Sequence, residues 1–301
     1  MRVFAVLVNW RNTARTIRCA EELRRWHIVR PTIIIVDNES SEDSRRALSQ
    51  AGVADEIVLS ATNLGYGGGN NLGIAAAARD NEAAILLLNS DVQIAEADVC
   101  QLVGRLAADR ALSIVGPLLA ERGDGRERCY AGGRDIARHR RTRIEVDAAH
   151  LTALAGSPLP PVDYVPGTVF LVRGSVFDEV GMLDEDYFFG GEIADFCTRA
   201  RAKNHQLRID ALARALHETD DSSNSPRDTL RVYYSLRNRF LYVRRHHAAD
   251  KLRYFGFWVM NAAWAAATAI VRGRFRRARA IVLATMHGLM GRYGNQNAEF
   301  I

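Results

Sequence analysis

Short apolar runs alternate with amphipathic segments through the first 120 residues, and this alternation constrains the fold most strongly. The apolar runs are β-branched or leucine-rich and lie at residues 3–8, 32–36, 56–59, 84–88 and 112–115. Segments with helical spacing separate them, at residues 13–26, 41–51, 69–79 and 96–109. Runs that are apolar throughout are typical of strands buried on both faces of a sheet. The order predicts an α/β fold with a mostly parallel sheet and helices on both faces.

The regular alternation ends near Glu121. Residues 121–162 contain a glycine turn signal and a basic run, and we expect an irregular insertion there. Periodicity then resumes, with a strand expected at 164–172, helices at 175–180 and 193–203, and short strands at 206–209 and 213–217. Beyond a polar loop at 218–225, the chain is expected to be helical to its end. The sequence therefore predicts an α/β domain at 1–225 and a helical region at 226–301.

Composition and charge exclude several classes of protein. The apolar fraction of 48% is too high for a disordered chain, and the length allows a sizeable core. Residues 201–301 contain 18 Lys and Arg against 7 Asp and Glu, whereas residues 1–200 contain 22 against 28. The four cysteines form no Cys-x-x-Cys pair, so we expect free thiols in a reducing compartment. The first apolar run is too short for a signal peptide and is expected to form a strand.

Polar side chains follow the second expected strand, in the run Val36-Asp37-Asn38. Ligands of open α/β sheets bind outside the carboxyl ends of the strands. A carboxylate at this edge can accept a hydrogen bond from a ribose hydroxyl or from a base N–H. Asp and Asn also cap helices well, so a simple helix cap explains the same pattern.

A glycine-rich run, Asn63–Gly73, links the third expected strand to an alanine-rich helix. Glycines let a backbone approach a ligand closely, and a helix start offers free N–H groups to an anion. A dinucleotide fingerprint would follow the first strand instead. The loop after the first strand, Asn9–Asn12, has no glycine, so the sequence argues against a Rossmann dehydrogenase.

The fourth expected strand ends in Asn89-Ser90-Asp91, which places two oxygen-bearing side chains at one sheet edge. Hard cations such as Mg²⁺ or Mn²⁺ take oxygen ligands and keep bound phosphate and water. Asp91 supplies charge, and Asn89 supplies a neutral oxygen. His217 ends the last short strand and is a candidate further metal contact, although a lone histidine is more often structural.

Two carboxylates, Glu192 and Asp195, share one face of a helix because they are three residues apart. They follow Gly190-Gly191 and a run of three aromatic residues. Acidic residues at a helix start are often only partners of the helix dipole. The glycines and aromatic residues before them are unusual for a plain solvated helix start, so both remain candidates for proton transfer.

Taken together, these motifs resemble the family 2 glycosyltransferases of the GT-A fold, and most of all their bacterial rhamnosyltransferase-like branch. The resemblance runs from Val3 to the C-terminus and is weakest at 121–162. It also includes three further runs, which are Gly167–Arg173, Gly181–Glu185 and the sequence Tyr-Tyr-Ser-Leu-Arg-Asn-Arg at 233–239. Many such motifs in the right order are far more specific than any one of them.

The resemblance implies an inverting hexosyltransferase, rhamnosyltransferase-like, of cell-envelope polysaccharide biosynthesis. A nucleoside diphosphate sugar would be the donor and a glycan or lipid-linked hydroxyl the acceptor. It implies that Asp91 and His217 bind Mg²⁺ or Mn²⁺ at the donor diphosphate. The expected donor-binding residues are Asn9, Asp37, Asn38, Asn63, Gly65, Asn71, Asn89 and Ser90.

One position departs from the family pattern. The branch usually has Glu-Asp-x-Asp where this chain has Glu192-Ile193-Ala194-Asp195, and the residue that matches Ile193 is the usual catalytic base. Isoleucine cannot accept a proton. Three explanations compete: Glu192 acts as the base, Asp195 acts as the base, or catalysis is weak or lost. We favour Glu192, because its longer side chain can reach an acceptor.

The basic last third contains Tyr254–Val271, which is apolar for 18 residues except Asn261 and is followed by a cluster of five arginines. An apolar helix that is flanked by basic residues is attracted to anionic lipid. We therefore expect peripheral docking on the cytoplasmic face of the plasma membrane, in preference to a true span. A helical hairpin packed on the catalytic domain is the plain alternative. Clustered arginine also suggests nucleic acid, but no nucleic-acid-binding motif accompanies it.

Two rival functions remain on sequence grounds. A nucleotidyltransferase on a similar sheet would release pyrophosphate from a nucleoside triphosphate. A non-catalytic sugar-nucleotide-binding or scaffold protein at a membrane complex would explain Ile193. The sugar, the nucleotide, the acceptor and the oligomeric state are not determined by the sequence.

Overall fold

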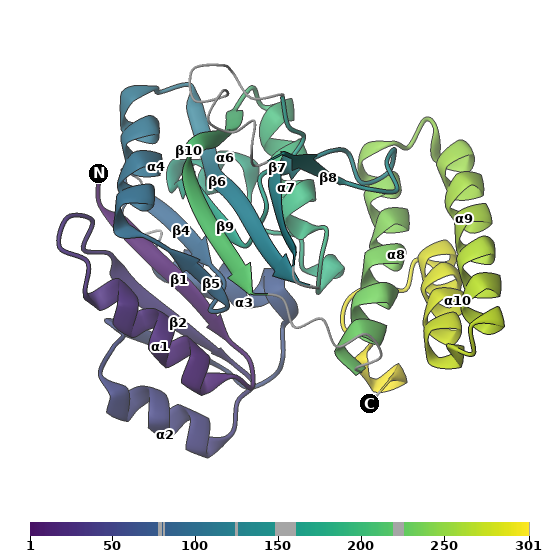
Figure 1. The fold of residues 1–301 in the computed structure, drawn as a ribbon, viewed down its shortest axis with the longest axis horizontal. Coiled ribbons are helices and arrows are strands. Elements are labelled where there is room, and N and C mark those ends of the chain that lie inside the picture. The colour runs from purple at the N-terminus through teal and green to yellow at the C-terminus, as the bar shows by residue number, and fades with distance from the viewer. Residues whose placement is uncertain (78–79, 81, 124–125, 148–160, 219–225, 301) are drawn as a thin grey trace.

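The computed structural model describes residues 1–77, 80, 82–123, 126–147, 161–218 and 226–300. An α/β part packs beside a group of three C-terminal helices (Figure 1). The strands are β1 Val3–Asn9, β2 Thr32–Asn38, β3 Glu56–Ser60, β4 Ala84–Leu88, β5 Val92–Ile94, β6 Leu112–Gly123, β7 Arg126–Gly133, β8 Arg143–Val146, β9 Val169–Arg173 and β10 Gln206–Glu218. The helices are α1 Thr13–Arg24, α2 Glu42–Ala51, α3 Gly65–Ala77, α4 Glu96–Ala108, α6 Ser175–Val180, α7 Glu192–Ala202, α8 Pro226–His246, α9 Lys251–Val271 and α10 Phe275–Met290, with short 3₁₀ turns η2 Glu185–Tyr187 and η3 Asn297–Glu299.

The central sheet has the order β3-β2-β1-β4-β9-β6-β10-β5. Strands β1 to β4 are parallel to one another, as the sequence predicts. Strand β9 runs antiparallel to both of its neighbours, and β5 runs antiparallel to β10. The mostly parallel sheet is thus confirmed, with two reversed strands on one side of β4.

Both faces of the sheet are covered because each central strand alternates its side chains between two apolar cores. From β1, Phe4 and Val6 enter the core beneath α3 and α7, whereas Ala5 and Leu7 enter the core beneath α1, α2 and α4. Burial on both faces explains why these strands contain almost no polar residue before their carboxyl ends.

Three elements differ from the sequence prediction. Helix α3 begins at Gly65, four residues earlier than predicted, because Asn38 and Asn63 fix the turn that precedes it. The segment expected to be an irregular insertion contains the end of β6 and all of β7 and β8, which pair with antiparallel register. Residues 148–160 of that segment lie outside the described residues, as do Arg79 and most of the expected loop at 218–225.

The remaining differences concern the second half. Strand β9 begins at Val169, so the expected strand start at 164 is wrong apart from an isolated bridge between Tyr164 and Gly133. The two short strands expected after residue 205 form one strand, β10, whose pairing with β6 shifts between Asp210 and Arg214. An irregularity of this kind bends a strand without ending it.

The C-terminal helices pack on one another and on the α/β part. Apolar side chains of α8 and α9, such as Phe240 and Trp258, share a core with Tyr187 and Ala194. Trp258 also donates a hydrogen bond from Nε1 to the Ala137 carbonyl at 2.8 Å. The expectation that the chain is helical to its end is wrong after Met290, where an irregular segment that contains the 3₁₀ turn η3 follows.

Candidate active site

A cavity of about 200 Å³ lies at the carboxyl ends of β1 and β4. The chain order reverses at this point of the sheet, since β2 lies on one side of β1 and β4 on the other. Such a switch point is where open α/β sheets bind their ligands. The lining combines six asparagines with Arg15, Asp91 and a set of aromatic side chains, which are Trp10, Tyr66, Phe188, Phe189 and Tyr234.

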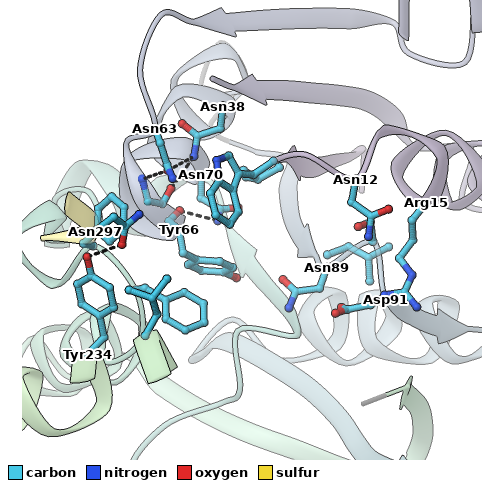
Figure 2. A pocket seen from close by; sticks show the side chains of 18 residues that line it. Asn12, Arg15, Asn38, Asn63, Tyr66, Asn70, Asn89, Asp91, Tyr234 and Asn297 are labelled. Carbon is cyan, nitrogen blue, oxygen red and sulfur yellow. Dashed lines mark hydrogen bonds between the residues drawn. The ribbon is translucent and has the colours of Figure 1, made fainter. Parts of the chain in front are cut away.

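The polar groups of this cavity gather at two ends (Figure 2). One end holds Asn12, Arg15, Asn89 and Asp91, and we call it the charged end. The other end holds only uncharged polar groups, and we call it the amide end. Its labelled members are Asn38, Asn63, Asn70, Asn297 and Tyr234, with Tyr66 between the two ends.

At the charged end, Asp91 and His217 form a close pair, with 3.4 Å between Oδ2 and Nε2. His217 Nδ1 lies 3.2 Å from Oε1 of Glu121, which in turn contacts Arg143. Burial raises the pKa of Asp91, but the hydrogen bond and charge of His217 outweigh it and leave that pKa below its usual value. Burial lowers the pKa of His217, and the bonds to Asp91 and Glu121 overcome this and raise it to about 9.

Glu121 was not a predicted site residue. It is placed opposite His217 by the parallel pairing of β6 with β10. Nothing in the local sequence of Glu121 indicates that partner, because the two residues are far apart along the chain. Only the strand register brings them together.

The charged end fits one divalent cation. Asp91 Oδ1 is buried and has no hydrogen-bond partner among the described residues, so one carboxylate oxygen is available for a ligand. The described part of the chain contains no cluster of three or more Asp, Glu, His or Cys that could hold a metal. A cation held by Asp91, and by His217 once that side chain has lost a proton, would therefore need further oxygen ligands from phosphate and water, as Mg²⁺ and Mn²⁺ commonly have.

Asn9 and Asp37 do not line the cavity, although the sequence suggested both as donor-binding residues. Each is fully buried. Asn9 Nδ2 donates to Asp37 Oδ1 at 3.0 Å and to Ser40 Oγ at 3.1 Å, while its Oδ1 accepts from Thr16 at 3.0 Å. In this structure they hold the ends of β1 and β2 together behind the cavity wall.

Asn38, Asn63 and Gly65 do line the cavity, and they fix its amide end. Asn38 Nδ2 donates to Asn63 Oδ1 and to the Gly65 carbonyl, at 3.2 and 3.0 Å. Asn63 Oδ1 also accepts from the Gly65 N–H at 2.8 Å. Gly65 has a φ of +74°, and a Cβ there would lie 2.1 Å from the Phe188 carbonyl oxygen.

Asn89 and Ser90 lie beside Asp91 in the cavity wall, as the sequence predicts. Asn71 does not line it. Its side chain exchanges hydrogen bonds with the backbone of Leu183, at 2.9 and 3.0 Å, and donates to Glu185 Oε1 at 2.8 Å. Asn71 therefore anchors the Gly181–Glu185 turn to α3.

A second cavity of about 310 Å³ adjoins the first, since Tyr66, Asn89 and Phe189 line both. Glu192 lies in its wall at the start of α7 and is 4% exposed. Its Oε2 is buried and has no partner among the described residues. Burial raises the pKa of Glu192 to about 7, and the negative charge of Asp195 adds a smaller increase. Hydrogen bonds from the backbone of Glu192 and Gly190 lower this pKa but do not outweigh burial.

Asp195 does not line either of these cavities. Its Oδ1 lies 2.7 Å from His246 Nε2, and its Oδ2 accepts from Arg199 Nε at 2.8 Å. Burial raises the pKa of Asp195, but the bonds and charges of His246 and Arg199 outweigh it and lower that pKa. Both oxygens are therefore occupied, unlike Oε2 of Glu192.

Ile193 lies in the wall of the second cavity and packs into the core beneath α3 and α7. A Cβ at Gly167 would lie 2.8 Å from its Cγ1, so the fit around this side chain is close. The position that corresponds to the usual catalytic base of the family is thus occupied by an apolar side chain, which lies next to a buried, ionisable glutamate.

Several lining residues come from the C-terminal region and were not predicted. Leu230, Tyr234 and Asn297 line the first cavity, and Ser235, Asn238 and Arg239 line the second. The Tyr-Tyr-Ser-Leu-Arg-Asn-Arg run at 233–239 was the available signal, because it supplies four of these six residues.

The order of the sheet and the helices on its two faces are those of the GT-A fold. The fold is similar to GalNAc-T7 crystallised with UDP, GalNAc and Mn²⁺, with a TM-score of 0.60 and 17% identity over 81% of this chain and 48% of that one. This chain therefore spans about half the length of that enzyme. It is also similar to the mannosyltransferase PcManGT from Pyrobaculum calidifontis in complex with GDP-Man and Mn²⁺, with a TM-score of 0.59 and 11% identity over 97% and 88%.

Residues 8–156 match the family model described as glycosyl transferase family 2. The chain is 26% identical, over 87% of its length and 83% of the relative, to the low-salt glycan biosynthesis hexosyltransferase Agl10 of Haloferax volcanii. Residues 8–156 thus match glycosyl transferase family 2 and the fold is GT-A, so that part of the sequence prediction is confirmed. This relative is archaeal, and the bacterial rhamnosyltransferase branch stays a prediction.

Proposed function

We propose that the protein transfers a hexose, with inversion, from a nucleoside diphosphate sugar to a hydroxyl group of a glycan or lipid-linked acceptor. The single observation that carries this proposal is the placement of Glu192. Glu192, whose Oε2 has no partner among the described residues, lines a cavity that adjoins the cavity of about 200 Å³ at the sheet edge. A carboxylate with a pKa near 7 is well matched to proton transfer at neutral pH.

The two ends of the first cavity suit the two halves of the donor. The diphosphate would lie at the charged end, beside Arg15 and Asp91, and the nucleoside at the amide end. Mn²⁺ or Mg²⁺, held there by Asp91 and His217, would supply positive charge to the departing diphosphate. The sugar would then lie near Tyr66, Asn89 and Phe189, where the two cavities meet.

The acceptor would enter the second cavity. Its hydroxyl oxygen attacks the anomeric carbon as the bond from that carbon to the diphosphate oxygen breaks, and the bonding electrons leave with the nucleoside diphosphate. Oε2 of Glu192 takes the hydroxyl proton. Ile193 and Tyr164 beside it exclude water from the reacting atoms, which limits hydrolysis of the donor.

A cytoplasmic membrane surface is the proposed location of the acceptor. One helix among the described residues, α9, is long and apolar enough to cross a membrane. Part of α9 is buried against α8 and α10, through residues such as Ala262 and Ala266, so we propose that the helix lies on the surface. Large apolar side chains remain exposed, at Met260, Trp264, Val271, Phe275 and Met290, next to the arginine cluster at 272–279.

Turnover of sugar nucleotides tests the enzymatic proposal. A panel of UDP-, dTDP- and GDP-sugars is incubated with Mg²⁺ or Mn²⁺, and release of the nucleoside diphosphate is measured. We expect Asp91→Ala to abolish turnover and Glu192→Gln to lower it roughly 10²–10⁴-fold. Release by wild-type protein that is unchanged in both variants would contradict the assigned roles. Release of pyrophosphate from nucleoside triphosphates would instead indicate a nucleotidyltransferase.

Vesicle flotation tests the membrane proposal. We expect the protein to float with phosphatidylglycerol vesicles at low salt, and less with pure phosphatidylcholine or at high salt, because arginines near the surface contribute about 1 kcal/mol each. The paired change Met260→Ser and Trp264→Ser removes apolar surface that is exposed in the folded protein. Flotation by the wild type that this variant retains in full would refute docking through α9.

A further inference from the structure

Asn297, which lies in the last ten described residues, lines the first cavity. The segment 291–300, which we call the C-terminal strap, follows α10 and returns to the sheet edge. Arg237 is fully buried and donates from Nη1 to the Gly294 carbonyl at 2.6 Å, while the Gly294 N–H donates to the Asp186 carbonyl at 2.8 Å. The strap is therefore fixed both to α8 and to the turn before α7.

The hydroxyl group of Tyr234 orients Asn297 within the strap. It accepts from the Gln296 N–H at 2.9 Å and donates to Asn297 Oδ1 at 2.9 Å. Because the oxygen of the Asn297 amide is held in this way, its Nδ2 is the group left for other partners. That Nδ2 has no acceptor among the described residues, and Asn297 lines the amide end of the cavity (Figure 2).

We infer that Asn297 recognises the base of the donor nucleotide, by donating a hydrogen bond from Nδ2 to an exocyclic carbonyl oxygen of that base. The inference rests on the proposed function, since it requires a nucleoside diphosphate in the first cavity. Uracil, thymine and guanine each carry such a carbonyl, whereas adenine carries none. The strap thus discriminates in favour of carbonyl-bearing bases.

The distribution of charge in the cavity supports this placement. Phosphate groups favour the end with Arg15 and the metal-binding Asp91, and this leaves the uncharged end for the nucleoside. Neutral amides suit the edge of a base, because they match its donors and acceptors without the cost of burying a charge. Aromatic side chains at that end, Phe188 and Tyr234, offer flat surfaces to a base.

The strap lies outside the segment that matches the family, which ends at residue 156. Its contact with the cavity depends on the Tyr233–Arg239 run, whose Tyr233 ring packs against Phe300 with 4.9 Å between ring centres. This gives the run a function in donor recognition that its sequence alone does not indicate.

Binding of UDP, dTDP, GDP and ADP, each with Mn²⁺, tests the inference by calorimetry on the full chain. We expect wild type to bind ADP most weakly. In the Asn297→Ala variant, the affinity for the nucleotide that wild type prefers should fall about tenfold, because a single buried hydrogen bond is lost. The affinity for ADP should stay nearly unchanged. The affinity of this variant for inorganic pyrophosphate, measured by competition, should stay within about twofold of the wild-type value, since the charged end is intact.

Gln296→Ala is the matched control. Its side-chain amide donates to the Tyr293 carbonyl within the strap, at 3.1 Å, and does not line the cavity. We expect this variant to bind all four nucleotides as wild type does, and melting temperatures without ligand check that both variants are folded. Equal losses in the two variants, or a parallel loss of pyrophosphate binding, would show that the strap acts on the whole pocket and would overturn the inference.

Two other outcomes are also decisive. An unchanged preference among nucleotides in Asn297→Ala overturns base recognition while the proposed function stands. Wild-type protein that binds none of the four nucleotides refutes the proposed function, and the inference with it.

Discussion

The most informative individual residues of this site are those with a buried polar group that lacks a hydrogen-bond partner. Asp37, Asp91 and Glu192 each have a buried carboxylate oxygen with no hydrogen-bond partner in the described structure, and of these only Asp91 and Glu192 line a cavity; both oxygens of Asp195 are bound. Burying an unpaired carboxylate oxygen destabilises a fold, so such groups are informative when they face a cavity. Asp91 and Glu192 correspond to the metal site and the base of the proposed reaction.

The pH profile of turnover checks the role of Glu192. A base must be ionised, so kcat/KM should rise with pH until about 7 and level off above it. The negative charge of Asp195 contributes to this raised pKa, and the rising limb should therefore move to lower pH in Asp195→Asn. Tyr66 also faces Glu192, but burial raises its pKa and it stays neutral throughout this range. A limb that stays at the same pH in Asp195→Asn would contradict the electrostatic coupling.

Gly65 gives a prediction about backbone conformation. Gly65→Ala should destabilise the protein by about 1–3 kcal/mol or more, because a side chain there meets both a positive φ and the Phe188 carbonyl. Gly52→Ala is the control: its φ is +63°, but no atom lies within 4 Å of the added carbon. Urea unfolding should show a clearly larger loss at Gly65. Equal losses would mean that the contact with Phe188 has no energetic effect.

At the scale of elements, α8 holds the loop that precedes Glu192, the proposed base. Asn238 donates from Nδ2 to the carbonyls of Tyr187 and Phe189, at 2.9 and 3.1 Å. The loop needs such support, since Phe188, Gly190 and Gly191 all have positive φ. The helical region is therefore part of the site, and the position of Glu192 depends on it.

Asn238→Ala should lower the free energy of unfolding by about 1–3 kcal/mol, because buried carbonyls lose their donor. It should also lower kcat, because the loop that carries Glu192 is less well held. Asn261→Ala is a suitable control, since that amide donates to the Phe257 carbonyl of its own helix and lies in neither cavity wall. Urea unfolding and donor turnover measure the two effects. Full activity in Asn238→Ala would argue against a positioning role.

The elements also show where sequence patterns are reliable. Strand β4 was predicted at its observed bounds because an isolated apolar run between polar residues has one simple interpretation. Strands β7 and β8 were missed because neither contains a continuous apolar run, although most of β7 is buried; β7 is held by pairing with β6, and β8 by pairing with β7. Helix α3 was predicted to start late because glycines usually interrupt helices, whereas here they allow close packing: a Cβ at Gly73 would lie 2.3 Å from Val6.

At the scale of the whole molecule, the two predicted regions are not independent. A fragment that ends at residue 225 lacks Leu230, Tyr234 and Asn297 of the first cavity and the helix that supports Glu192. We expect the affinity of such a fragment for nucleoside diphosphates to be at least tenfold lower than that of the full chain. We also expect the aromatic side chains that now pack on α8 to become exposed. Calorimetry on the fragment and the full chain checks this. Equal affinity would show that residues 1–225 form a complete donor site.

The distribution of charge along the sequence can be interpreted only in the whole folded molecule. The excess of arginine lies in the helical region, but three of its members have no role at the surface. Arg237 and Arg239 bind the backbone carbonyls of Tyr187 and Ile136 at the junction between the two regions, and Arg244 binds the Leu289 carbonyl within the helical region. The cluster at 272–279 is more exposed, so only part of the positive charge is available to a membrane.

By itself, the sequence determined the order of the elements, the α/β class, and the polar residues at the ends of β2 and β4. These features follow from local burial patterns and from the rule that sheet edges bind ligands. Only the tertiary structure decided which of those residues face a cavity and which, like Asn9 and Asp37, hold the wall from behind. It also brought Glu121 to His217 and Asn297 to the donor cavity, because strand register and chain reversal join residues that no local pattern connects.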